Sequence, residues 1–127
     1  MPADSVYARV TAEKYENLVK EAKDANFNML RVWGGGIYPC DDFFDACDEL
    51  GLVVFNDLMF ACAEVPDYPS MLDNIEAEVR ENLIRIRHHA SLAVISGNNE
   101  VEVTIEYCWK DERQTERKKT YIKIFEH

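Results

Sequence analysis

Long apolar runs are absent from this sequence of 127 residues, and none approaches the roughly 20 residues that a membrane-spanning helix requires. The first five residues, Met1 to Ser5, also lack the basic region and the apolar stretch of a secretory signal. We therefore expect no membrane span, and no signal peptide is visible. Apolar residues nevertheless make up 47% of the chain and charged residues 30%, which is typical of a globular domain with its own core.

Basic residues are scarce, because 14 lysines and arginines stand against 24 aspartates and glutamates, for a formal net charge of −10. A surface of that sign repels a phosphate backbone unless a basic patch compensates. The one candidate patch, residues 113–119, is interrupted by Glu116 and preceded by Asp111 and Glu112. Such a stretch is typical of a solvated face of mixed charge, so we expect no nucleic-acid partner.

None of the four cysteines has the paired spacing of a zinc knuckle or a redox motif. The His88-His89 pair has no cysteine near it in the sequence and follows a predicted helix, whose C-terminal end favours cations. We therefore expect neither a metal site nor a cofactor. All four cysteines are interpreted as small buried residues, and their disulfide state is left open.

Apolar residues recur at the spacing of one helical face in four stretches of the sequence. We expect these helices between Thr11 and Asn26, between Asp41 and Gly51, from Ser70 to His89, and from Val101 onward. Thr11 and Asp41 are expected to cap the first two helices, and Ser70 begins the third in a capping-box pattern. The last residues, 121–125, form an apolar patch to which we assign no structure.

Three short apolar runs lie between these helices, and each ends in polar residues. They cover residues 28–33, 52–57 and 92–96, lengths that are typical of strands buried in a parallel sheet. Alternating helices and strands predict an α/β fold with about three parallel strands and four helices. In such a fold the carboxyl ends of the strands meet at one edge, where functional sites form.

The polar residues at the three strand ends are the candidates for a functional site. Arg31 stands in an apolar run, where an unpaired charge is costly, so we expect it to contact a carboxylate or a water-filled cavity. Trp33 ends the first strand and Asp57 ends the second, while Asn99 and Glu100 follow the third. A simple helix cap is the alternative at the third strand end, but three polar strand ends together favour a site.

Three stretches of this sequence resemble motifs of the β-mannosidases, especially those of the animal lysosomal type. They are NMLRVWGGGIY at residues 28–38, FNDLMFACA at 55–63 and GNNE at 97–100. The resemblance runs from Pro2 through Glu100 and, more loosely, to Lys123. Residues 59–62 resemble β-mannosidases more than the related β-galactosidases or β-glucuronidases. This is an argument against a galactoside or a glucuronide as the substrate.

The resemblance implies that residues 1–127 form part of a TIM barrel, an eight-stranded (β/α) barrel, from after its first strand through its fourth strand and the following helix. It implies a lysosomal glycoside hydrolase that removes terminal non-reducing β-D-mannose with retention from a β-mannoside oligosaccharide. Glu100 is then the acid/base, and Asn99 binds the 2-hydroxyl of the sugar. By the same resemblance Arg31, Trp33 and Asp57 line the mannose pocket.

The size of the chain keeps a second hypothesis open. A complete barrel takes about 250 residues, and the nucleophile of the family lies on the seventh strand. Retaining hydrolysis needs that second carboxylate about 5 to 5.5 Å from the first, so we expect the 127-residue chain alone to be inactive. The alternative is a non-catalytic partial barrel that serves as a binding or assembly module. Both hypotheses leave sheet edges unpaired, and we expect pairing with the rest of a barrel or self-association.

Overall fold

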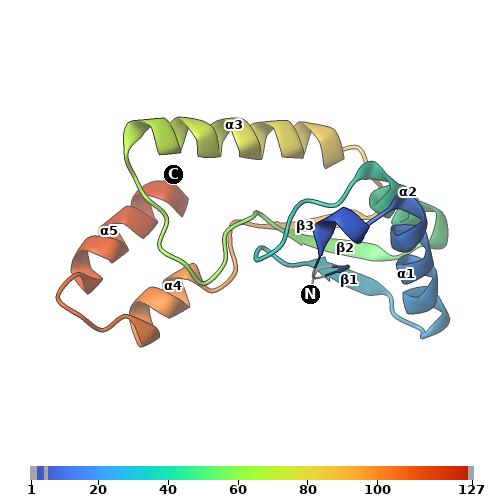
Figure 1. Cartoon of the computed structure of the whole chain (residues 1–127), viewed down its shortest axis with the longest axis horizontal. Coiled ribbons are helices and arrows are strands. Elements are labelled where there is room, and N and C mark those ends of the chain that lie inside the picture. Colours follow the sequence, from blue (N-terminus) through green and yellow to red (C-terminus); the bar gives the residue numbers. More distant parts are fainter. Residues whose placement is uncertain (1–2, 5, 126–127) are drawn as a thin grey trace.

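The structure is a computed structural model that describes residues 3–4 and 6–125 (Figure 1). Residues 1–2 and 5, part of the N-terminal stretch considered above for a signal, lie outside the described residues, as do 126–127. Parallel strands alternate with helices, which confirms the predicted α/β class. In the described part of the chain, no helix combines the length and the apolar character needed to cross a membrane.

Within residues 3–4 and 6–125, ten elements follow one another. They are the 3-10 helix η1 (Tyr7–Arg9), α1 (Ala12–Asp24), β1 (Met29–Val32), α2 (Asp41–Leu50), β2 (Val53–Asp57), α3 (Pro69–Ile86), β3 (Leu92–Ser96), α4 (Val101–Val103), the π-helical turn η2 (Thr104–Cys108) and α5 (Gln114–Phe125). The α-helices number five in these residues, one more than predicted. The additional helix is α5, whose one buried residue is Arg117, so its sequence lacks the apolar stripe that reveals a helix.

The three strands form a parallel sheet in the order β1-β2-β3. Phe55 in the central strand pairs with Arg31 on one side and Val94 on the other, after a register shift between Val54 and Phe55. An isolated parallel bridge between Ala61 and Asn99 continues the pairing beyond β2 and β3. The segments that follow these two strands therefore stay side by side at the carboxyl edge of the sheet.

The core lies between the sheet and the helices α1 and α2, at one end of the molecule in Figure 1. Its fully or nearly buried residues are Tyr15, Val19, Val32, Phe43, Phe44, Ala46, Cys47, Leu52, Val54 and Ile86. Exposure alternates along β1, since Val32 is buried while Met29 and Arg31 are exposed on the other face. The uncovered face of the sheet thus carries Arg31, whose guanidinium carbon lies 5.3 Å from the ring centre of Phe55.

Three predicted helix boundaries are confirmed, one at the start of a helix and two at C-terminal ends. The Thr11 hydroxyl accepts a hydrogen bond from the Lys14 backbone N–H at 3.2 Å and caps α1. Asn26 follows α1 with φ of 62°, and Gly51 ends α2 with φ of 69°. Both residues adopt the left-handed conformation that glycine and asparagine tolerate best.

Two predicted helix caps are wrong, the first by one residue and the second by two, since Tyr68 and not Ser70 is the N-cap of α3. Cys40, not Asp41, is the N-cap of α2, and the Asp41 carboxylate instead pairs with Arg85 of α3. The helix α3 begins at Pro69, before Ser70, and no side chain of the described chain caps it. Proline is favoured at the first helical position because its missing N–H is not needed there, and this preference replaces the expected capping box.

Candidate functional site

Arg31, near the end of β1, binds residues from the ends of the two neighbouring strands. Its Nη2 donates to Asp57 Oδ2 at 2.7 Å and to Asn99 Oδ1 at 2.8 Å, and its Nε donates to Asp57 Oδ1 at 3.3 Å. The charge that stood in an apolar run is therefore paired with a carboxylate, as the sequence predicted. The polar ends of the three strands meet at this arginine.

Asp57 is fully buried, and both of its carboxylate oxygens accept hydrogen bonds. Besides binding Arg31, its Oδ2 accepts from the Gly34 backbone N–H at 3.1 Å. The side chain of Arg31, in contrast, is 49% exposed. Asp57 therefore fixes the guanidinium, and Arg31 is the member of the pair that is accessible from outside.

The backbone at Gly34 approaches its neighbours too closely for any side chain. A Cβ atom there would lie 2.5 Å from the Leu58 carbonyl oxygen and 2.6 Å from that of Phe60. Backbone atoms cannot move aside as a flexible side chain can, so glycine is required at this position. The close approach is what brings the Gly34 N–H to the Asp57 carboxylate.

Glu100 directly follows Asn99 and precedes α4, with its side chain exposed. Its Oε2 lies 3.6 Å from the Cys62 Sγ. Both Glu100 and Cys62 adopt the left-handed conformation, with φ of 57° and 50°. That conformation costs a residue other than glycine on the order of 1 kcal/mol, and such strain often marks functional sites.

Backbone hydrogen bonds hold the Cys62 and Glu100 segments together. The Asn99 N–H donates to the Phe60 carbonyl at 2.9 Å, and the Cys62 N–H donates to the Asn99 carbonyl at 3.0 Å. The Glu100 carbonyl in turn accepts from the Thr104 N–H at 2.9 Å, within the helical segment that follows. The position of Glu100 is thus set by secondary structure on both sides.

Cys62 is the residue of this site that the sequence did not reveal. The interpretation of all four cysteines as buried is wrong for three of them, because only Cys47 is buried. Burial raises the pKa of the Cys47 thiol to about 12. Cys40, Cys62 and Cys108 are exposed, and all four cysteines lie in the described chain as free thiols. No spacing in the sequence distinguishes Cys62 from the other exposed cysteines.

Trp33 and Arg31 line the same cavity, whose volume is about 480 Å³. The cavity is also lined by the N-terminal segment, α1 and residues 35–37, so it lies along the free edge of β1. Asp57, Asn99 and Glu100 do not line it. Arg31 therefore connects this cavity to the hydrogen-bonded residues at the ends of β2 and β3.

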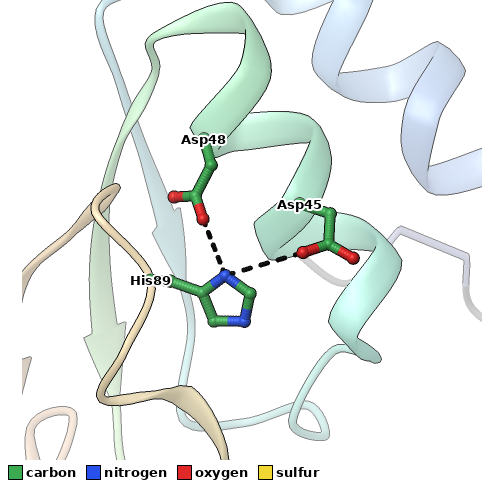
Figure 2. Close-up of side chains that lie close together, drawn as sticks. All are labelled: Asp45, Asp48 and His89. Atoms are coloured by element: carbon green, nitrogen blue, oxygen red, sulfur yellow. Dashed lines mark hydrogen bonds and ion pairs between the residues drawn. The ribbon is translucent and has the colours of Figure 1, made fainter.

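A second polar cluster, drawn in Figure 2, contains His89, which precedes β3. It lies toward the amino ends of the strands, whereas Arg31 and Asp57 lie toward the carboxyl ends of theirs. His89 Nδ1 is 2.8 Å from Asp48 Oδ2 and 3.8 Å from Asp45 Oδ1, while Asp48 Oδ1 accepts from the Ser91 N–H at 2.7 Å. Burial acts to raise the pKa of Asp48, but its hydrogen bonds with Ser91 and His89 outweigh burial and hold that pKa below its usual range.

Imidazole and carboxylate groups can hold a metal ion, and among the described residues Asp45, Asp48 and His89 are the one group close enough together to do so. The hydrogen bonds of Asp48 already join α2 to the turn between α3 and β3. We interpret the cluster as a structural connection between these elements.

Comparison with known proteins finds relatives among the β-mannosidases. The β-mannosidase of Rattus norvegicus is 47% identical over 109 residues, which are 86% of this chain and 12% of the rat protein. That of Bos taurus is 42% identical over 125 residues, 98% of this chain and 14% of the cattle protein. The crystal structure of the β-D-mannosidase from Dictyoglomus thermophilum matches with a TM-score of 0.86 at 40% identity, over 99% of this chain and 16% of that one. No protein-family model matches.

These matches show that the three strands and their helices correspond to a segment of a glycoside hydrolase barrel, as predicted. The chain spans only 12 to 14% of the length of the two animal relatives.

Proposed function

We propose that this chain supplies the acid/base carboxylate and part of the sugar pocket of a retaining glycosidase. The proposal starts from its homology to one segment of the β-mannosidases. The substrate is a terminal non-reducing β-D-mannose residue of an oligosaccharide, and the similarity to animal β-mannosidases supports a lysosomal location. One observation carries the proposal: Arg31, Asp57 and Asn99 are hydrogen-bonded at the carboxyl edge of the sheet, and Glu100 follows Asn99 directly.

Glu100 is assigned the proton transfers. In retaining hydrolysis one carboxyl group gives a proton to the leaving oxygen and then takes a proton from the water that attacks the glycosyl intermediate. The exposed side chain of Glu100 at a strand end suits this role. The nucleophile, a second carboxylate at about 5 to 5.5 Å, is assigned to no residue of this chain, so the 127-residue polypeptide alone is expected to be inactive.

The sugar contacts are assigned from the resemblance to the β-mannosidases, together with the chemistry of each side chain. Arg31 is half exposed and keeps N–H groups free for sugar hydroxyls after it has bound Asp57 and Asn99. Asn99 is assigned to the 2-hydroxyl, and Trp33 offers the sugar ring an apolar face beside Arg31. Asp57 contributes through Arg31, because its carboxylate is fully buried.

A non-catalytic partial barrel is the second candidate function, and the open sheet favours it. Both β1 and β3 are edge strands, and they carry the exposed apolar residues Met29, Val94 and Ile95. Unpaired edges with apolar side chains associate with further strands. The partner is either the rest of a barrel or a second copy of the chain.

The experiment that tests the proposed function is a chimera. The matched 16% of the Dictyoglomus thermophilum β-D-mannosidase is replaced by residues 1–127, and hydrolysis of a chromogenic β-mannoside is measured. We expect an active chimera in which Glu100→Gln lowers kcat by about 10² to 10⁴-fold, the usual contribution of an acid/base group. The control Glu102→Gln, two residues further on, leaves kcat unchanged. A folded chimera that keeps its activity after Glu100→Gln contradicts the proposal.

A further inference from the structure

The hydrogen bonds around Asn99 fix the orientation of its amide. The guanidinium of Arg31 can only donate, so the Asn99 atom that faces it at 2.8 Å is the oxygen Oδ1. The amide nitrogen Nδ2 then faces the other way and donates to the Cys62 Sγ at 3.4 Å. The sulfur of Cys62 is therefore the acceptor in this contact.

The Cys62 thiol has one hydrogen to donate and two acceptors within reach. Glu100 Oε2 lies at 3.6 Å and the Asn99 carbonyl oxygen at 3.9 Å. The carboxylate is both nearer and, being charged, the stronger acceptor. Arg31 thus donates a hydrogen bond to Asn99, Asn99 donates to Cys62, and Cys62 donates to Glu100.

Packing does not account for a cysteine at this position. Its side chain is exposed, and its left-handed backbone is one that glycine or asparagine adopts more readily. Glu64, the nearest charged residue along the same loop, is bound by Arg113 and Arg117 of α5 at 2.9 and 3.2 Å. The polar contacts of the Cys62 thiol are those with Asn99 and Glu100.

We infer that Cys62 is a positioning residue for Glu100, whose carboxylate it holds next to Asn99 by a hydrogen bond from a thiol that Asn99 orients. The catalytic meaning of this contact rests on the proposed function, whereas the contact itself does not. Glu100 is exposed, so without this donor its carboxylate is free to rotate away from the leaving oxygen. Alkylation of the Cys62 sulfur would likewise remove the donor and add bulk beside the carboxylate.

The first experiment measures the reactivity of the thiol in the 127-residue chain. Cys40→Ser and Cys108→Ser leave Cys62 as the exposed thiol, since Cys47 is buried. The rate of alkylation by iodoacetamide, an uncharged reagent, is followed from pH 6 to pH 9 in this background, with and without Glu100→Gln. A carboxylate next to a thiol disfavours the reactive thiolate.

We expect Glu100→Gln to raise the alkylation rate of Cys62 several-fold at neutral pH, because the thiol loses the neighbouring carboxylate. The matched control Glu102→Gln removes a charge two residues away and should leave the rate unchanged. An effect of Glu102→Gln as large as that of Glu100→Gln, or no effect of Glu100→Gln, overturns the inference.

The second experiment separates the positioning role from the proposed function. In the chimera, Cys62→Ala should lower kcat with little change in KM, because the Glu100 carboxylate loses the donor that orients it. Cys62→Ser, which keeps a donor, should restore kcat, and the control Cys40→Ala should change neither constant. An active chimera that is insensitive to Cys62→Ala overturns the positioning role alone. A folded but inactive chimera overturns the proposed function and this role with it, while the alkylation result still tests the contact.

Discussion

Arg31 and Asp57 form a two-pronged ion pair across the first two strands of the sheet. Nη2 reaches Oδ2 at 2.7 Å and Nε reaches Oδ1 at 3.3 Å, although the residues are 26 positions apart in the sequence. The planar fork of arginine matches a carboxylate in this arrangement, which fixes the orientation as well as the place of the guanidinium. The same nitrogen Nη2 then holds Asn99, so this pair organises the site.

Asp57→Ala should destabilise the chain by about 2 kcal/mol, because it removes a charged acceptor from both Arg31 and the Gly34 N–H. The matched control is Asp67→Ala, which breaks an exposed pair with Lys123 and should cost less than about 1 kcal/mol. Urea unfolding of the three proteins provides the comparison. Equal losses of unfolding free energy in the two variants would show that the buried ion pair stabilises the chain no more than the exposed pair does.

Gly34→Ala should lower the free energy of unfolding by about 1 to 3 kcal/mol, the usual cost of overpacking. The added Cβ would meet the carbonyl oxygens of Leu58 and Phe60 at 2.5 and 2.6 Å and push the Gly34 N–H away from Asp57. Gly97→Ala is the control, because the nearest atom to its added Cβ is 4.0 Å away. In thermal melting, Gly97→Ala should have a melting temperature near that of the parent chain. An equal drop in melting temperature in both variants would argue against this account.

The contribution of Asp48 to stability should depend on pH. Its hydrogen bonds hold the pKa of Asp48 below the usual range despite partial burial, so the ionised carboxylate stabilises the fold above the ordinary pKa of an aspartate. This contribution is lost as the pH falls through the lowered pKa of the folded state. Asp48→Asn should therefore lower the melting temperature at pH 7 and lower it progressively less as the pH falls below the ordinary pKa of an aspartate, whereas the exposed neighbour Asp45→Asn should have a small effect throughout. A pH-independent deficit in Asp48→Asn would refute this.

The open edges of the sheet predict that the chain associates as its concentration rises. Met29 of β1 and Ile95 of β3 are 44% exposed on these edge strands. Ile95→Lys should weaken association, because a charge on an edge strand opposes pairing with another strand. Gel filtration over a range of concentrations measures the effect, with Ile84→Lys on the exposed side of α3 as the control. A monodisperse monomer that unfolds cooperatively would contradict the expectation.

The sequence predicted the site best where an unfavourable arrangement would cost much folding free energy. A charge inside the apolar run of residues 29–32 must be paired, and the structure pairs Arg31 with the carboxylate that ends the next strand. Helix ends set by a local backbone preference, such as Thr11 and Gly51, were also predicted correctly. Helix starts that depend on distant contacts were not, since Asp41 is drawn to Arg85, 44 positions away.

Cys62 could not be predicted for a similar reason. Its exposure and left-handed backbone follow from pairing with Asn99, which is 37 positions further along the chain. Neither hydropathy nor spacing reports such a contact. The helix α5 was missed because its one buried residue, Arg117, is charged, and ion pairs with Glu64 and Asp111 hold it. Patterns of apolar residues reveal helices that bury an apolar stripe, and α5 does not.

The most direct measurement of whether Glu100 protonates the departing oxygen compares two β-mannosides in the chimera. A dinitrophenyl leaving group departs without a proton, whereas an alkyl leaving group requires one. We predict that Glu100→Gln lowers kcat/KM for the alkyl mannoside by about 10² to 10⁴-fold and changes it little for the dinitrophenyl mannoside. Equal losses with both substrates, or none with either, would contradict the assignment of Glu100 as the acid.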